Sequence, residues 1–109
     1  RSLTESQQQT MVMVVDNYTN AANQNHLAAQ FNLGNMYSEG KGVTQDNTEA
    51  VEWYRKAADQ GYVKAQFSLG HMYKDGEGVA QDINKSVEWH RKAANQGSAK
   101  AQVFLGAIY

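Results

Sequence analysis

Apolar residues recur at helical spacing in two consecutive segments near the middle of the chain. In the first segment they step by three or four residues and so define one face of a helix: Ala29, Leu33, Met36 and Tyr37. The second segment begins at Asp46, a favourable helix N-cap, with a glutamate three residues on to complete a capping box. Its inner face is formed by Val51, Tyr54 and Ala58, with Trp53 and Ala57 beside them. The pattern predicts a helix, a glycine-rich turn, a second helix and a glycine stop.

The same pattern returns 36 residues later. Shifting the sequence by 36 positions aligns residues 29–61 with residues 65–97, and 21 of the 33 aligned pairs are identical. A third copy begins at Ala101. Because neither helix of such a unit can bury its apolar face alone, neighbouring units must stack on one another. We therefore expect an all-α fold, an α-solenoid of about two and a half helical hairpins.

The shift also extends backward, faintly, into the residues before the first full copy. Val15, Tyr18 and Ala22 align with residues of the second helix, and Asn25 stands where the later copies have glycine. Asparagine is second to glycine as a left-handed helix C-cap, so the replacement respects the backbone. A helix here could start at Ser2-x-x-Glu5 or Thr4-x-x-Gln7, although the valine-rich stretch alone would also fit a strand.

We interpret the whole chain as a single domain, residues 1–109, with internal boundaries set by the repeat. Its expected parts are a polar N-terminal extension (1–10), a degenerate second helix of a preceding repeat (11–25), two repeats (26–61 and 62–97) and the first helix of a truncated repeat (98–109).

Composition excludes several classes of function. Ten basic and eleven acidic residues leave a net charge of −1, which gives no electrostatic reason to expect nucleic acid as a partner. No apolar run approaches the roughly 20 residues that span a bilayer, so we expect a soluble domain with no membrane insertion. The chain has no cysteine, which excludes disulfides and thiol catalysis. It lacks an initiator Met and a signal-peptide pattern, so we expect a fragment, with its compartment unknown.

The repeated motifs resemble the Sel-one-like repeat (SLR) family, a relative of the tetratricopeptide repeat. The period here is 36 rather than the tetratricopeptide 34, and the extra length lies in Gly-x-Gly-Val. The first copy fills the family pattern with Ala29-Gln30, Leu33-Gly34, Tyr37, Gly40-x-Gly42-Val43, Asp46, Ala50, Trp53, Lys56-Ala57-Ala58 and Gly61. The second departs at Ser86, where alanine is usual. The resemblance covers about residues 25–109 and implies a right-handed superhelical solenoid that acts as a non-enzymatic scaffold or adaptor.

The residues with reactive side chains form no catalytic or metal-binding motif. His26, His71 and His90 have no second histidine four residues away and no carboxylate cluster. His90 stands where the first copy has Tyr54, which favours a half-buried aromatic substitute. Trp89 recurs at the position of the first tryptophan, which favours packing between hairpins, with a binding role still open. We therefore expect no enzyme activity, no cofactor and no metal.

Positions that differ between the copies are the better candidates for function. The resemblance implies that the first helix of each hairpin lines a concave surface, and helical geometry places its variable residues in one stripe. Such a surface, with phenylalanines in its middle and lysines at its edges, would suit an acidic protein or peptide. The predicted contact residues are Phe31, Asn35, Ser38, Lys64, Phe67, His71, Lys74, Lys100 and Val103. The alternative is that the phenylalanines are core residues that bridge the hairpins.

Two further functions stay open. Some cysteine-rich relatives in the family are proposed to hydrolyse or bind cell-wall-derived or β-lactam-like ligands, but this chain has no cysteine. The last helix would present an uncovered apolar face, which predicts truncation or self-association through the C-terminal helix. That face consists of Val103, Leu105, Ile108 and Tyr109.

The glycines within and after the first helices need a physical reason. A glycine in a helix interior costs roughly 1 kcal/mol relative to alanine, and both copies accept this cost, at Gly34 and Gly70. We expect these two glycines to let the helix backbones of a hairpin approach closely, opposite the alanines of the second helix. The remaining turn glycines are expected to adopt positive φ: Gly40, Gly42, Gly76 and Gly78.

Overall fold

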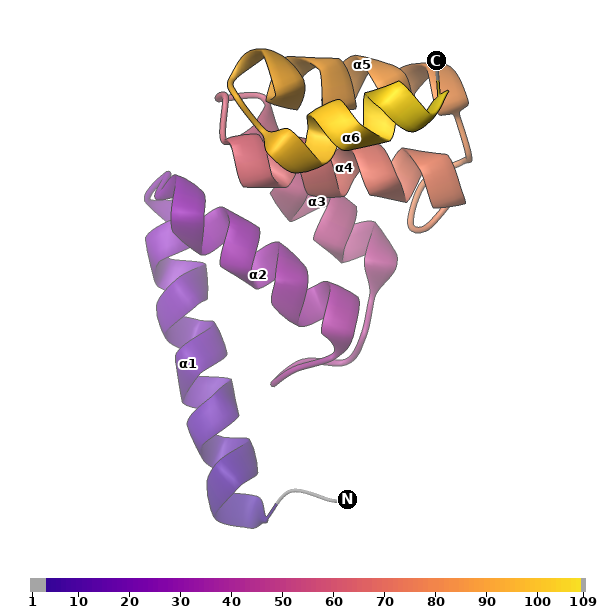
Figure 1. Cartoon of the computed structure of the whole chain (residues 1–109). Helices are drawn as coiled ribbons and strands as arrows, with labels where there is room; N and C mark the ends of the chain where they lie inside the picture. Colours follow the sequence, from indigo (N-terminus) through magenta and orange to yellow (C-terminus); the bar gives the residue numbers. More distant parts are fainter. Residues whose placement is uncertain (1–3, 109) are drawn as a thin grey trace.

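The chain folds as a stack of antiparallel helices (Figure 1). The computed structural model describes residues 4–108, and within them there are six α-helices and no strand. Their bounds are α1 Glu5–Asn23, α2 Leu27–Glu39, α3 Asn47–Ala58, α4 Val63–Asp75, α5 Ile83–Asn95 and α6 Ala99–Ile108. The molecule measures 48 × 30 × 22 Å, an elongated shape in which each helix packs on its neighbour along the chain. The prediction of an all-α solenoid is confirmed.

Helices α1, α3 and α5 begin at N-cap residues that are recognisable in the sequence. The Thr4 side chain accepts a hydrogen bond from the Gln7 amide and the Gln7 side chain accepts one from the Thr4 amide, a complete capping box. The valine-rich segment is therefore helical, and the polar residues 5–10 form its first turns. The Asp46 and Asp82 carboxylates accept hydrogen bonds from the backbone amides three residues on.

Two closely similar hairpins, α2–α3 and α4–α5, form the centre of the stack. The glycine that follows the first helix of each hairpin has φ near +70°, and so does the glycine two residues later. The predicted positive-φ conformations are thus confirmed at all four turn glycines. At the end of each turn the N-cap aspartate donates its amide to the carbonyl of a tyrosine in the first helix, at 2.8 and 2.9 Å.

A glutamine ladder joins consecutive hairpins and includes α1. Gln30 donates to the Ala22 carbonyl at 3.2 Å, Gln66 to that of Ala58 at 3.2 Å, and the third copy has the same bond at 3.3 Å. Asn25 has φ 65°, the left-handed conformation that Gly61 and Gly97 adopt at the same place. Helix α1 therefore packs on α2 as α3 packs on α4, in the register expected for the second helix of a repeat.

The core lies between the helices of each hairpin and continues across the stack. One cluster of buried residues surrounds Leu69 and joins α3, α4 and their neighbours, and a second surrounds Leu33 and joins α1, α2 and α3. Both leucines have no exposed surface. Trp53 belongs to the second cluster and is buried, which fits the packing role expected from its repeat position.

Gly34 and Gly70 make room for an aromatic ring, not for a backbone. A Cβ atom added at Gly34 would lie 2.7 Å from the Tyr54 ring, and one added at Gly70 would lie closer still to the His90 ring. The expectation that these glycines face the alanines of the second helix is wrong. A ring placed on the helix surface occupies the volume that any side chain would need, so glycine is required although it weakens the helix.

We expect substitution of Gly34 or Gly70 by alanine to destabilise the protein by about 1–3 kcal/mol, because the ring must move outward. Gly106 occupies the same repeat position in α6, where no atom of the described residues lies within 4 Å of an added Cβ. Gly106→Ala should therefore be neutral, or stabilising by up to about 1 kcal/mol through helix propensity. Urea unfolding of the three variants measures the difference, and equal effects at all three positions would contradict the ring contact.

Candidate interaction surface

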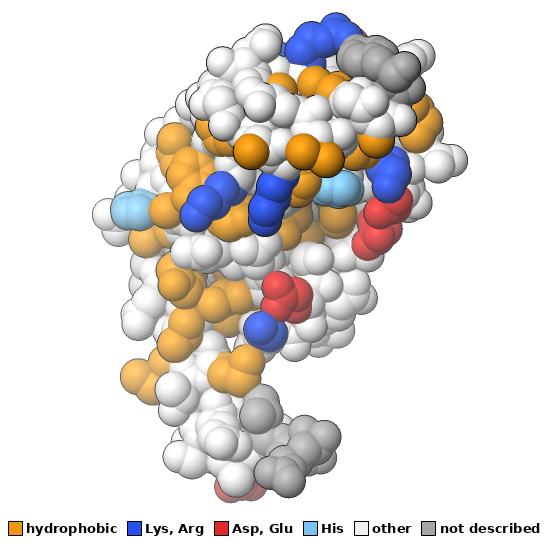
Figure 2. Space-filling model, in the orientation of Figure 1, with side chains coloured by type: hydrophobic (Ala, Val, Ile, Leu, Met, Phe, Trp, Pro, Cys, Tyr) orange, Lys and Arg blue, Asp and Glu red, His pale blue; other side chains and the backbone are white. Residues whose placement is uncertain are grey.

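The first helices of the hairpins share one face of the molecule. Helices α2, α4 and α6 face the viewer in Figure 1, and we call this side the α2–α4–α6 face. In the same orientation, Figure 2 shows lysine and histidine side chains in a band across the middle of this face, with hydrophobic side chains between and below them. The three helices come together here because consecutive hairpins stack in the same orientation.

A pocket of about 320 Å³ lies on this face and draws residues from all three helices. We call it the lysine pocket, after the two lysines at the same position of consecutive repeats. Its lining consists of Phe31, Val63, Lys64, Phe67, Ser68, Ser98 and Lys100. Four of the predicted contact residues therefore come together, the two phenylalanines and these two lysines. Val103, also predicted, does not line the pocket; its side chain is 74% exposed on α6.

Phe31 is both part of the pocket and part of the core. Its ring centroid lies 5.9 Å from that of Tyr54 and 5.6 Å from that of Tyr62, and the side chain is half-buried. The core interpretation therefore applies to one side of the ring, which bridges two hairpins, while the other side faces the pocket, where partner contact stays a prediction. The ring gives the pocket a fixed apolar wall, since its neighbours restrict its rotation.

Asn35 and Ser38, two other predicted contact residues, hold Tyr54 in the first hairpin. The Tyr54 hydroxyl donates to the Asn35 side-chain oxygen at 2.5 Å. Burial raises the pKa of Tyr54 to about 12, although a hydrogen bond with Ser38 lowers it. The phenol therefore remains neutral at physiological pH, and Asn35 serves the hairpin by binding it.

The second hairpin replaces this pair by a cluster of four aromatic rings. His71 stands at the position of Asn35 and His90 at that of Tyr54, with ring centroids 5.0 Å apart. Phe104 of α6 stacks on His90 at 3.7 Å and contacts His71 edge-on at 5.7 Å, while Phe67 contacts both histidines. His90 is fully buried, more than the half-buried state expected from the sequence. Phe104 was not predicted because its position carries Asn32 and Ser68 in the other copies.

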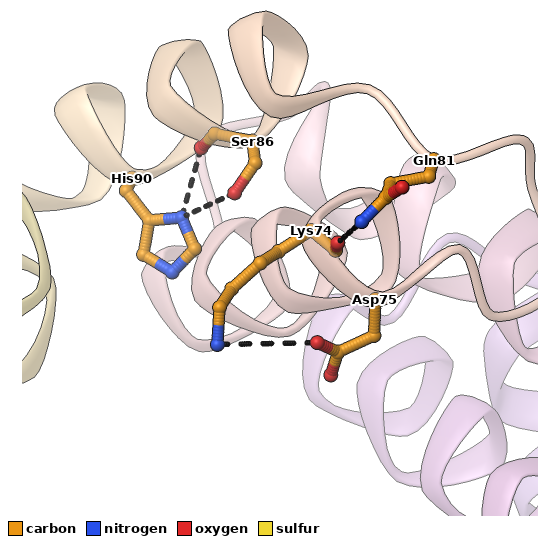
Figure 3. Close-up of polar contacts among 5 residues, drawn as sticks. All are labelled: Lys74, Asp75, Gln81, Ser86 and His90. Carbon is orange, nitrogen blue, oxygen red and sulfur yellow. Dashed lines mark hydrogen bonds and ion pairs between the residues drawn. The ribbon is translucent and has the colours of Figure 1, made fainter. Parts of the chain in front are cut away.

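Ser86 and His90 lie close together in α5, but they do not form a nucleophile and its base (Figure 3). The His90 Nδ1 atom is 2.8 Å from the Ser86 carbonyl oxygen and 3.5 Å from its hydroxyl oxygen. A carbonyl only accepts, so Nδ1 carries the proton and cannot take one from the hydroxyl. Both residues have no exposed surface, so a substrate has no access to them.

The remaining nitrogen of His90 has no partner. Its Nε2 atom is buried and makes no hydrogen bond with any described residue. Burial lowers the pKa of His90, the Ser86 carbonyl raises it, and the charges of His71 and Lys74 lower it further. Burial also lowers the pKa of His71, and the nearby Lys74 adds to this effect. Both imidazoles are therefore held neutral at physiological pH.

The α2–α4–α6 face is positively charged at the lysine pocket. The Lys74 ammonium lies 3.9 Å from an Asp75 carboxylate oxygen and 5.8 Å from the centre of the Phe104 ring. Lys64 and Lys100 are exposed, and neither has a carboxylate within 4.0 Å among residues 4–108. These two ammonium groups are therefore available to a negatively charged ligand.

The tryptophans lie on the second helices, outside this pocket. Trp53 is buried and Trp89 half-buried, and each ring carries a lysine ammonium over it, Lys56 at 4.3 Å and Lys92 at 4.5 Å. Among the described residues, no group of three His, Asp or Glu side chains is placed to hold a metal ion. Across the same residues, no helix combines the length and hydrophobicity needed to cross a membrane.

Comparison with known proteins identifies the repeats. The family model described as Sel1 repeat matches residues 27–62 and 63–98, which are the two copies found by the 36-residue shift. No curated protein matches the sequence significantly.

Solved structures resemble the chain over most of its length. The crystal structure of a Sel1 repeat protein from Oxalobacter formigenes is 37% identical with a TM-score of 0.86, covering 90% of this chain and 40% of that one. The c5321 protein, a protective antigen of uropathogenic Escherichia coli with an SLR fold, is 43% identical with a TM-score of 0.83, covering 84% and 20%. Helicobacter pylori cysteine rich protein B is 26% identical with a TM-score of 0.81, covering 84% and 69%. The chain thus spans less than half the length of the first two structures.

The lowered pKa values of His71 and His90 predict that acid destabilises the fold. Their folded-state pKa values lie below the ordinary 6.5, so the unfolded chain binds more protons and stability falls as pH drops below 6.5. Carboxylates titrate near pH 4, so the range from pH 7.5 to 5.5 isolates the histidines. The free energy of unfolding, measured in urea at both values, should be smaller at pH 5.5.

A matched control for this pH dependence is present in the chain itself. A variant that carries, at four positions of the aromatic cluster and its surroundings, the residue found 36 positions earlier should lose most of the difference in unfolding free energy between pH 7.5 and 5.5. Its substitutions are His71→Asn, Ser86→Ala, His90→Tyr and Phe104→Ser. An unchanged pH dependence in this variant would assign the effect to groups outside the aromatic cluster.

Proposed function

Because the chain belongs to the Sel1 repeat family, whose repeats generally form protein–protein interaction modules, we propose that it is a non-enzymatic scaffold module that binds an acidic peptide segment of a partner. We expect the partner on the α2–α4–α6 face, because it is formed by the first helices of the hairpins, which the family resemblance implies line a concave surface. The chain needs no cofactor for this role, since recognition depends on shape, apolar contact and charge.

One observation carries the proposal: two lysines that have no ion-pair partner among residues 4–108 flank a pocket with walls of Phe31 and Phe67. Lysines at the same position of consecutive repeats place two positive charges along the path of a bound chain. The phenylalanines supply apolar surface between them, and two half-buried serines of the lining, Ser68 and Ser98, can bond to a peptide backbone. Negative charge on the partner then affects which partner binds, and how fast it associates, more than how tightly it binds.

Charge reversal in the pocket tests the proposal. A phage-displayed library of eight-residue peptides, panned on the wild-type chain at low salt, should yield sequences enriched in Asp and Glu. The variant Lys64→Glu/Lys100→Glu should bind these peptides at least tenfold more weakly, because two attractions become repulsions. Affinity is measured by fluorescence anisotropy of a selected, labelled peptide.

The control for this experiment is Lys56→Glu/Lys92→Glu, with the same change in charge and the same 36-residue separation on the second helices. It should bind the peptides as the wild type does, apart from a small effect of net charge. Equal losses in the two variants, or selected peptides without acidic enrichment, would contradict a binding site at the lysine pocket. Circular dichroism establishes that both variants remain helical.

The enzyme alternative has a weaker basis in this chain. The Ser86 hydroxyl lies 3.5 Å from the His90 Nδ1 atom, but both side chains are buried and Nδ1 carries a proton, so it cannot act as a base toward the hydroxyl. Hydrolysis of cell-wall-derived or β-lactam-like ligands above a heat-inactivated control would favour that alternative.

Self-association is a second candidate function, favoured by exposed apolar side chains on the end helices. Val103 of α6 is 74% exposed, and Val12 and Met13 of α1 are 49% and 65% exposed. Light scattering over a hundredfold concentration range distinguishes a constant monomer mass from a dimer. A constant mass would exclude self-association.

A further inference from the structure

The aromatic cluster of the second hairpin shares a residue with the lysine pocket. The cluster consists of the rings of Phe67, His71, His90 and Phe104. Phe67 is a wall of the lysine pocket, and the same ring contacts His71 edge-on at 4.5 Å and His90 at 5.1 Å. Phe104 lies on α6, the helix that also brings Lys100 to the pocket. A change within the cluster can therefore reach the pocket along two routes, the Phe67 ring and helix α6.

The His90 imidazole is closed off from solvent by its neighbours. Its Nδ1–H group donates to the Ser86 carbonyl at 2.8 Å, so the free lone pair is on Nε2. That atom is buried and has no hydrogen-bond partner among residues 4–108. The Phe104 ring stacks on the imidazole, with centroids 3.7 Å apart and planes 19° apart. A proton added at Nε2 would have no acceptor in this arrangement, so the stacked cluster favours the neutral imidazole.

The charged groups on α4 also oppose protonation of the cluster. Burial is the main cause of the lowered pKa of both histidines, and the charge of Lys74 lowers both pKa values further. Asp75 raises the pKa of His71. In Figure 3, however, the Lys74 side chain lies between the His90 imidazole and the Asp75 carboxylate. Within residues 4–108, neither histidine has a carboxylate oxygen within 4.0 Å.

The two helices beside α4 offer no compensating carboxylate at the cluster. On α6, the one charged side chain within residues 99–108 is Lys100, which is positive. On α5, the charged side chains are all exposed, whereas His90 has no exposed surface. These α5 residues are Lys85, Glu88, Arg91 and Lys92. A proton on His90 would therefore need water, which reaches Nε2 only if the packing around the imidazole opens.

We propose that the aromatic cluster is a pH-sensitive support of the lysine pocket: protonation of His90 separates the imidazole from Phe104, loosens α6 from the second hairpin and weakens binding of the acidic peptide. The proton binds at Nε2, and a water molecule becomes its hydrogen-bond acceptor once the Phe104 ring has moved. The effect on binding rests on the proposed function, whereas the change in the ring contact does not.

The expected direction is opposite to that of charge alone. Carboxylates titrate near pH 4, so an acidic peptide keeps its charge at pH 5.5. Additional positive charge on His71 and His90 would then strengthen its binding as the pH falls. Weaker binding at pH 5.5 therefore requires a change in the structure of the pocket. A histidine with the ordinary pKa of 6.5 in the opened cluster shifts the balance toward that state by up to about tenfold at pH 5.5.

Peptide affinity at two pH values tests the link to the pocket. The probe is the tightest acidic peptide obtained by panning, with a fluorescent label that does not itself titrate between pH 5.5 and 7.5. Its affinity for the wild-type chain should be at least threefold weaker at pH 5.5. His90→Phe keeps a ring against Gly70 but cannot be protonated, so it should bind the peptide equally well, or more tightly, at pH 5.5. His90→Tyr, which copies Tyr54, serves if the first variant does not fold.

NMR without ligand tests the ring contact itself. The nuclear Overhauser effects between the Phe104 and His90 rings should be present at pH 7.5 and lost at pH 5.5. The matched control lies in the first hairpin, where the rings of Phe31 and Tyr54 are 5.9 Å apart. The pKa of Tyr54 is raised to about 12, so neither control ring changes charge in this range. The control contact should therefore persist at both pH values.

The possible failures are distinguishable. Persistence of the Phe104–His90 contact at pH 5.5 would overturn the inference, and so would loss of both ring contacts together, since acid would then unfold the whole chain. Loss of the first contact alone, with peptide affinity unchanged or higher, would overturn the link to the lysine pocket and leave the proposed function intact. Equal weakening by acid in His90→Phe would assign the effect to other groups. If no acidic peptide binds at either pH, the proposed function fails, and the ring contacts alone determine whether the cluster responds to acid.

Discussion

An aromatic ring placed against a helical glycine sets the distance between the two helices of each hairpin. The Tyr54 ring fills the space where Gly34 would carry a side chain, and His90 does the same at Gly70. This contact fixes how far the first helix stands from the second, and hence which of its residues face outward. The contact also explains why both copies have a glycine inside a helix. The free energy gained when the ring buries its apolar surface offsets the roughly 1 kcal/mol that the glycine costs in helix propensity.

Once this contact and the glutamine ladder hold the stack, the outward positions are free to differ between repeats. Residues 28, 64 and 100 share one repeat position and are Ala, Lys and Lys. Residues 32, 68 and 104 share another and are Asn, Ser and Phe. The same backbone therefore presents a basic pocket at Lys64 and Lys100 and an aromatic cluster around His90. Chemical variety at this surface comes from side chains that packing does not constrain, as in other solenoids.

The repeat made the helices, their caps and the left-handed Asn25 predictable, because each depends on local backbone chemistry that the sequence displays directly. It did not reveal what lies against Gly34, since the contact depends on how two helices are rotated about their axes. Phe104 was missed for a related reason: it packs on His90 of the preceding hairpin, and its own position varies among the copies. Local patterns were thus predictable, and contacts between hairpins were not.

The second hairpin has His90 at the repeat position of Tyr54, and this difference affects the α2–α4–α6 face. The tyrosine hydroxyl donates a hydrogen bond to Asn35, whereas the Nε2 atom of His90 has no partner among residues 4–108, which costs stability because the atom is buried. Phe104 covers that imidazole, and Phe104 lies on the same helix as Lys100 of the lysine pocket. Because α6 carries both Phe104 and Lys100, the packing of Phe104 on His90 helps to position the helix that brings Lys100 to the lysine pocket. A contact made with the second hairpin therefore also helps to position part of the candidate interaction surface.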